Sequence, residues 1–360
     1  MVPRLFKGVH RPIVWIASIL TLLGICVIYS ASFRMGGGYA AKQATWALVA
    51  VSVFFVTGWI GYRSFLNVSY LIYALSLGLL VFVLGFGETH LGANRWLAVG
   101  PFAWQPSELA KVATILALAQ YLGGRGVIEK QKRSFLMTLA LVLVPMFLIM
   151  VQPDLGSALV FFPVLIAIVF FWGLRIRYLL SLAAIGLALM PLAWYVLKPY
   201  QQKRLLVFFN PSADPIGAGY TAIQSKIAVG SGGLVGKGWL AGTQTQLDFV
   251  PEHHTDFIFS VVGEEFGFLG SVFMIFLFVL LLFYIFNIVD RTTDVKARLL
   301  AIGVAMFFAF QVFINIGMTI GLAPITGLTL PFISYGGSSL VSTFFALGLV
   351  VSIYKERSIF

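Results

Sequence analysis

Residues 271–288 read SVFMIFLFVLLLFYIFNI, a run of eighteen residues without a charged side chain. A helix of about 20 apolar residues spans the hydrocarbon core of a bilayer. Similar runs lie at Ile13–Tyr29 and Leu136–Met150, and 60% of the chain is hydrophobic while only 10% is charged. Because a soluble domain carries about 25% charged residues, lipid must solvate much of this surface. The sequence predicts an integral membrane protein.

Working outward from that run, we expect about ten membrane-spanning helices in a single polytopic domain, residues 1–360. They lie near residues 12–32, 43–60, 67–87, 107–122, 134–151, 155–173, 177–197, 266–288, 298–321 and 338–354. The predicted fold class is therefore an all-α integral membrane protein. A long segment, residues 198–265, separates helices 7 and 8, and a connection of that length is expected to contain short helices of its own.

The distribution of Lys and Arg predicts the orientation. With the N-terminus inside, fifteen of the 24 Lys and Arg residues and only four of the 13 acids fall on the inner side, so the formal charge of +11 lies there. This is the bias that the positive-inside rule describes. We expect both termini in the cytoplasm and residues 198–265 outside, and the basic composition needs no nucleic-acid partner to explain it.

The first group of candidate functional residues lies in LGANRWLAVGPFAWQPSELAK, residues 91–111. Pro106 suits the first turn of a helix, so Glu108 would lie near the positive helix end, and Lys111 follows on the same face. The pair is explained by a cap and a lysine that snorkels to the interface, or by Lys111 and the helix N-terminus holding a phosphate. Three further candidates precede them in the chain: Asn94, Arg95 and Trp96.

A second candidate, Asp154, lies in VQPDLGSALV, residues 151–160, between two apolar runs with almost no loop. An aspartate at this place can simply cap the following helix. Its functional interest comes from its expected position on the same side of the membrane as Glu108, Lys111 and the long outer segment.

The third group lies in QLDFVPEHHTDFIFSVVGEEFG, residues 246–267. Adjacent histidines with one nearby acid do not match the usual spacing of zinc ligands. Asp256 or Thr255 could cap a helix that starts at Phe257. Alternatively, Asp256 is a carboxylate in a partly apolar pocket, with the raised pKa that a general base needs. The residue types alone leave these alternatives open. The ionisable residues of the group are Asp248, Glu252, His253, His254, Asp256, Glu264 and Glu265.

Seven segments together resemble the SEDS family (shape, elongation, division and sporulation). They occur in the family's order and cover most of the chain from about residue 90 onward. The short N-terminal segment is more similar to the rod-shape branch of the family than to the division branch. The segments are LGANRWL, QPSELAK, QPDLGSA, FFNPSADPIGAGY, QSKIAVGSGGLVGKG, VPEHHTDFIFSVVGEEFG and TGLTLPFISYGGSS.

The resemblance implies a peptidoglycan glycosyltransferase that polymerises lipid II at the outer face of the cytoplasmic (inner) membrane during cell elongation. The implied catalytic residue is Asp256, acting as general base in one inverting displacement. Other functional positions of the family match Glu108, Lys111 and Asp154. We group these three with four further residues as substrate-binding candidates: Asn94, Arg95, Trp96 and His253.

The expected partners are lipid II, membrane lipids and a class B penicillin-binding protein that cross-links the product. We expect no tightly bound cofactor, although the carboxylates would suit Mg²⁺ or Mn²⁺. The alternative function is a lipid II flippase. It is disfavoured because a transport path needs polar residues across both leaflets, whereas charges are sparse on the inner halves of the expected helices.

Overall fold

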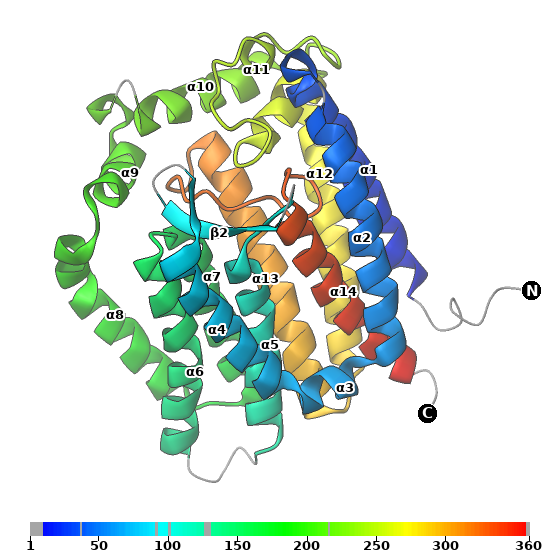
Figure 1. Ribbon diagram of the computed structural model, residues 1–360, viewed down its shortest axis with the longest axis vertical. Helices are drawn as coiled ribbons and strands as arrows, with labels where there is room; N and C mark the ends of the chain where they lie inside the picture. The colour runs from blue at the N-terminus through cyan, green and yellow to red at the C-terminus, as the bar shows by residue number, and fades with distance from the viewer. Residues whose placement is uncertain are drawn as a thin grey trace, which may run out of the picture.

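Long helices dominate the structure, a computed structural model that describes residues 10–36, 38–90, 93–99, 102–125, 131–214 and 217–357. Figure 1 shows their arrangement. In chain order the elements are α1 (Arg11–Ala31), η2 (Phe33–Met35), α2 (Gly38–Ile60), α3 (Tyr62–Asn67), α4 (Ser69–Phe86), β1 (Glu88–His90), β2 (Ala93–Val99), β3 (Phe102–Trp104), α5 (Pro106–Gly123), α6 (Gln131–Val151), α7 (Leu155–Trp172), α8 (Ile176–Val196), α9 (Pro199–Phe209), η3 (Pro211–Ala213), α10 (Ala218–Ser231), α11 (Thr243–Gln246), α12 (Ile258–Asp290), α13 (Val295–Ile320) and α14 (Gly337–Arg357).

The membrane prediction is confirmed. Within the described residues, eight helices are long and apolar enough to cross a membrane: α1, α2, α4, α6, α7, α12, α13 and α14. The other two expected spans correspond to α5 and α8. The chain is an all-α membrane protein.

Two local features differ from the expectation. Residues 88–104 contain a three-stranded antiparallel sheet, in which Glu88 lies opposite Trp96 and Leu97 lies opposite Trp104. Aromatic and β-branched residues favour these strands, but the runs are too short to be distinguished from interfacial loops by sequence. The expected helix at 266–288 starts earlier, at Ile258. A short helix before Gly267 continues into the expected one through a kink, at which the backbone of Gly267 is non-helical.

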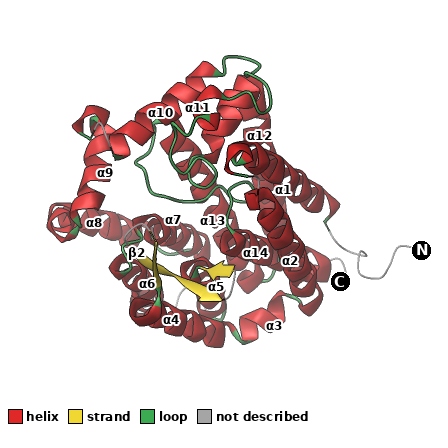
Figure 2. Ribbon diagram, turned by 45° about the horizontal axis from the view of Figure 1, so that its top comes forward, coloured by secondary structure: helices red, strands yellow, loops and turns green. Residues whose placement is uncertain are grey.

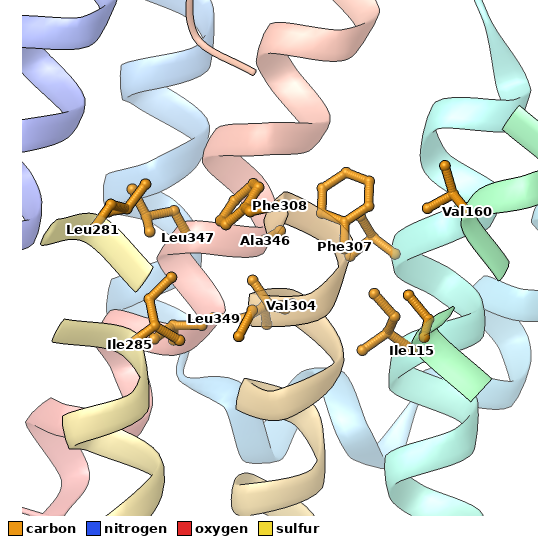
Figure 3. Packing of buried hydrophobic residues seen from close by; sticks show 14 of the residues in the cluster. Ile115, Val160, Leu281, Ile285, Val304, Phe307, Phe308, Ala346, Leu347 and Leu349 are labelled. Carbon is orange, nitrogen blue, oxygen red and sulfur yellow. The ribbon is translucent and has the colours of Figure 1, made fainter. Parts of the chain in front are cut away.

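Helix α13 is the centre of the bundle. Its side chains Phe307 and Phe308 are almost fully buried. Figure 3 shows α13 between two layers of apolar side chains, which come from α5 and α7 on one side and from α12 and α14 on the other. The labelled neighbours are Ile115, Val160, Leu281, Ile285, Ala346, Leu347 and Leu349. Such close packing makes α13 a rigid support for the groups attached to it.

The two ends of the bundle differ in character. At one end, Arg63 at the start of α3 pairs with Glu356 near the end of α14 at 2.9 Å, and the Tyr62 hydroxyl donates to Asp294, the N-cap of α13. The opposite end carries α9, α10 and α11, which arch over the bundle (Figure 1). Figure 2, with this end turned forward, shows the strands and the long loops gathered there.

A largely buried segment without helical structure, residues 322–336, connects α13 to α14 at this second end. Leu328, Leu330, Phe332 and Ile333 are almost completely buried in it. Helix α1 crosses the segment closely at Gly24, where an added methyl group would lie 2.6 Å from the Phe332 carbonyl oxygen. Because that neighbour is backbone, it cannot rotate away.

We therefore expect Gly24→Ala to destabilise the protein by about 1–3 kcal/mol, since it forces α1 away from this segment. The matched control is Gly78→Ala in α4, where an added methyl group meets no atom within 4 Å. Thermal unfolding of the detergent-solubilised protein measures both. Equal melting temperatures for the two variants would contradict the close crossing.

Candidate active site

Asp256 lies at the end of the loop between α11 and α12, two residues before α12 begins. Its amide donates to the Glu252 carbonyl at 3.1 Å. Its carboxylate faces Gly327 of the buried segment: a methyl group added to Gly327 would lie 3.2 Å from Asp256 Oδ2 and 3.8 Å from Arg204 Nη1. The carboxylate of Asp256 and the guanidinium of Arg204 therefore border the same small space.

The surroundings of Asp256 make it a stronger base than an ordinary aspartate. Burial raises the pKa of its carboxyl from 3.8 to about 6, because a buried site disfavours the charged form. The nearby Arg204 opposes this rise in pKa, while the charge of Glu252 adds to it. Such a carboxylate is largely ionised at neutral pH and still accepts a proton readily. The alternative role, a side-chain cap for α12, is not observed, since α12 has Phe257 as its N-cap and no side-chain cap bond.

Asp154 connects three elements near this space. It caps α7 by accepting from the Ser157 amide at 3.1 Å, as its position predicted. Its other oxygen accepts from Gln105 Nε2 at 3.0 Å, and Arg95 Nη1 of β2 lies 3.7 Å from Oδ1. The carboxylate is buried, so it holds the guanidinium of Arg95 in place. Capping and charge pairing are thus combined in one residue.

Arg204 was not among the residues predicted from sequence. It lies on α9, half-buried, with its guanidinium 5.8 Å from the ring centroid of Tyr200. The Tyr200 hydroxyl in turn donates to the Pro153 carbonyl at 2.5 Å, which fastens α9 beside Asp154. Nothing in the sequence separates Arg204 from its basic neighbours Lys198 and Lys203. Only the fold shows that it is the one that faces Asp256.

The predicted pair of Glu108 and Lys111 is present, but it lies in the protein interior. Lys111 Nζ is 2.7 Å from Glu108 Oε1, and the two side chains are only 1% and 5% exposed. The ammonium lies 5.5 Å from the ring centroid of Phe307 on α13. In the part of the chain that the structure describes, neither residue forms a hydrogen bond or ion pair with Asp256 or Arg204. Lys111 is therefore not snorkelling, and it is not exposed to a phosphate here.

His253, expected to bind substrate, is occupied by the protein itself. Its two ring nitrogens each lie 2.7 Å from a backbone oxygen, those of Val250 and Ala31, and the side chain is buried. It ties the loop to the end of α1 and is not free to contact a substrate. Trp96 is half-buried in β2. The side chain of Asn94 lies outside the described residues, although its backbone pairs with Thr89.

The acidic residues at the end of the third group serve as anchors. The buried Glu264 accepts hydrogen bonds from Lys237 Nζ at 2.7 Å and from the amides of Gln244 and Thr245. Glu265 accepts from the Ser30 hydroxyl of α1 at 2.5 Å. No group of three or more His, Cys, Asp or Glu residues able to hold a metal ion occurs within the described ranges.

The chain is similar to known proteins over most of its length. The family model described as "Cell cycle protein" (FtsW, RodA and SpoVE) matches residues 11–359. The peptidoglycan glycosyltransferase MrdB of Escherichia coli K12 is 40% identical over 287 residues, which cover 79% of this chain and 77% of that protein.

Two solved structures are also similar to this chain. A chain of a peptidoglycan synthase complex that coordinates polymerization and crosslinking superposes with a TM-score of 0.84, at 36% identity, covering 97% of this chain and 98% of that one. The rod shape determining protein RodA of Thermus thermophilus gives a TM-score of 0.74 at 31% identity and covers 98% of both chains. The chain therefore belongs to the FtsW, RodA and SpoVE family, the SEDS family that its sequence motifs resemble.

Proposed function

We propose that this chain, a peptidoglycan glycosyltransferase of the SEDS family, polymerises lipid II with Asp256 as the general base. The observation that carries the proposal is the carboxylate of Asp256. It is fixed beside Gly327 and Arg204, with a pKa of about 6. Its relatives named peptidoglycan glycosyltransferases support the reaction class.

The reaction is a single displacement. The carboxylate of Asp256 accepts the proton of the 4-hydroxyl of the acceptor GlcNAc as that oxygen bonds to C1 of a lipid-linked MurNAc. The bond from C1 to the phosphate oxygen breaks, and its electron pair leaves with undecaprenyl pyrophosphate. Because the bond is α in the donor and β in the glycan, one inverting step is sufficient.

The pyrophosphate needs positive charge as it departs. Arg204 and Arg95 supply it, since a guanidinium binds phosphate oxygens through two parallel N–H donors. Asp154 orients Arg95. The two arginines take the role expected of Lys111, which is paired with Glu108 in the protein interior. The pair of Glu108 and Lys111 connects the first turns of α5 to Phe307 of α13 and so supports the site from the protein interior.

The lipid tail approaches from the side of α8 and α9. None of the α8 side chains that the structure describes is buried, so this helix is solvated by lipid along much of its length. In Figure 1, α8 touches the bundle at its first turns and its later part stands apart from α6 and α7. It leads to α9, which carries Arg204. A polyprenyl chain lying along α8 would bring its pyrophosphate to the two arginines.

The membrane orientation follows the charge distribution. The chain is a multi-pass protein of the cytoplasmic (inner) membrane with both termini in the cytoplasm, and the Asp256 end faces outward, as the positive-inside rule requires. The partner is a class B penicillin-binding protein, a transpeptidase that cross-links the new strand. The similar chain from a complex that couples polymerization to crosslinking supports this assignment.

The protein has no tightly bound cofactor in this mechanism. Mg²⁺ or Mn²⁺ carried by the pyrophosphate would add positive charge at the leaving group, and the carboxylates of Asp154 and Asp256 are the nearby oxygen donors of the kind these ions prefer. The flippase alternative is disfavoured. A head group would need polar side chains across the whole bundle, whereas the described core around Phe307 is mostly apolar and its buried charges, Glu108 and Lys111, pair with each other.

Replacing the base tests the chemistry directly. We expect Asp256→Asn to reduce glycan polymer formation from purified lipid II by about 10²–10⁴-fold, because proton transfer loses its acceptor. The control is Glu252→Gln, an exposed carboxylate of the same loop, which should keep most of the activity. Gel analysis of the glycan chains, with the transpeptidase partner present, measures both. Polymer formation by folded Asp256→Asn at the wild-type rate would refute the assignment.

The pH dependence has a defined direction. Activity should rise as pH increases through about 6, where Asp256 loses its proton. Because folding raises this pKa, the carboxyl stabilises the folded state below its ordinary value near 4, and that contribution is lost as pH rises through 6. Asp256→Asn should therefore melt above wild type at pH 8 and approach it at pH 4. A melting difference that does not change with pH would contradict the raised pKa.

Arg204 has a second, electrostatic consequence. Arg204→Ala should lower kcat/KM for lipid II by about 10- to 100-fold, the value of a charged hydrogen bond. It should also move the acid limb of the activity profile to higher pH, since Arg204 lowers the pKa of Asp256. The neighbouring exposed Lys203→Ala is the control. If the two variants behave alike, Arg204 does not face the leaving group.

A further inference from the structure

Three consecutive backbone carbonyls, those of His254, Thr255 and Asp256, accept hydrogen bonds from residues that are distant in the sequence. Tyr335 N donates to the His254 carbonyl at 3.1 Å, Ser334 Oγ to the Thr255 carbonyl at 2.6 Å, and Asn315 Nδ2 to the Asp256 carbonyl at 2.8 Å. These bonds are tertiary contacts and belong to no helix or sheet hydrogen-bond pattern. They fix the backbone that leads into the catalytic carboxylate.

Asn315 makes the most informative of the three contacts. It lies on α13, fully buried, and its Nδ2 also donates to the Leu328 carbonyl at 2.7 Å. Leu328 follows Gly327, the residue that faces the carboxylate of Asp256. The Asn315 amide thus links the backbone of Asp256 to the backbone of residues 327–328, which lies opposite the Asp256 carboxylate. The separation between Asp256 and Gly327 depends on this amide.

The segment that contains Gly327, residues 322–336, is also hydrogen-bonded to the helical bundle. Ser334 Oγ accepts from the Leu330 amide at 2.8 Å, which closes the turn around Phe332. Gln43 of α2 donates to the Ser334 carbonyl at 3.1 Å and accepts from the Gly336 amide at 3.2 Å. Both α2 and α13 are long helices of the bundle. These bonds therefore fix the position of Asp256 relative to the rigid part of the molecule.

We propose that Asn315 is a positioning residue for the general base, with Ser334 as its second support. The inference rests on the proposed function of Asp256. Loss of the Asn315 amide removes one hydrogen bond from the Asp256 carbonyl and one from the Leu328 carbonyl, and it releases Asp256 from Gly327. A displacement of about 1 Å in a reacting group can reduce the rate about 100-fold. A released carboxylate also becomes better solvated, so it protonates only at lower pH.

The test compares Asn315→Leu with Gln311→Leu. Gln311 lies one turn earlier on the same helix, is fully buried, and its amide atoms have no hydrogen-bond partner. We expect Asn315→Leu to lower kcat for lipid II polymerisation by about 10- to 100-fold with little change in KM. The acid limb of its pH profile should move to lower pH. Gln311→Leu should retain wild-type kcat and the wild-type acid limb.

Ser334→Ala provides a second variant if Asn315→Leu does not fold. It removes one hydroxyl and should also lower kcat more than it changes KM. The proposal is overturned if either folded variant keeps the wild-type kcat and acid limb, or if activity falls only in proportion to the amount of folded protein. Wild type and Asp256→Asn are run in the same assay. Activity in Asp256→Asn would refute the base itself, whereas an inactive Asp256→Asn beside a fully active Asn315→Leu refutes only the positioning role.

Discussion

The pairing of buried, non-helical backbone is the constraint on which the Asp256 end of this protein depends. Residues 322–336 have no helical hydrogen bonds, yet most of them are at least partly buried among α1, α2, α13 and α14, and buried peptide groups without partners are strongly unfavourable. Two side chains from the bundle, the amides of Gln43 and Asn315, and one from the segment itself, the hydroxyl of Ser334, pair with these groups. Because the last two also bind the carbonyls of Asp256 and Thr255, the bonds that make the segment stable also locate the base.

The electrostatics of the site follow from the same arrangement. Burial makes Asp256 basic, and Arg204 keeps that effect moderate, so the carboxylate is ionised yet able to accept a proton near neutral pH. A second carboxylate, Asp154, is committed to the α7 N-terminus and to Arg95. The two aspartates therefore have different surroundings: Asp256 has a raised pKa, whereas Asp154 is held by a helix N-terminus and lies beside Arg95.

The sequence was sufficient for the membrane class, the long helices and the family, because long apolar runs and ordered motifs are strong local signals. It was insufficient where tertiary contacts decide the outcome. Arg204 has no local feature that separates it from Lys203, and only the path of α9 brings it to Asp256. His253 and Lys111 carry suitable chemistry, yet the fold uses them for internal contacts with Ala31 and Glu108. The strands of residues 88–104 and the kink at Gly267 depend on pairing and packing that no short run reveals.

The role of the Asp256 carboxylate as the base is tested most directly by observing that carboxyl titrate. A wild-type-minus-Asp256→Asn infrared difference spectrum, recorded across pH, isolates its protonation. The account predicts a midpoint near 6 that coincides with the acid limb of kcat/KM, since this limb reports the ionisation of the free enzyme. A midpoint near the ordinary value of 3.8, or an acid limb that does not follow the titration, would contradict it.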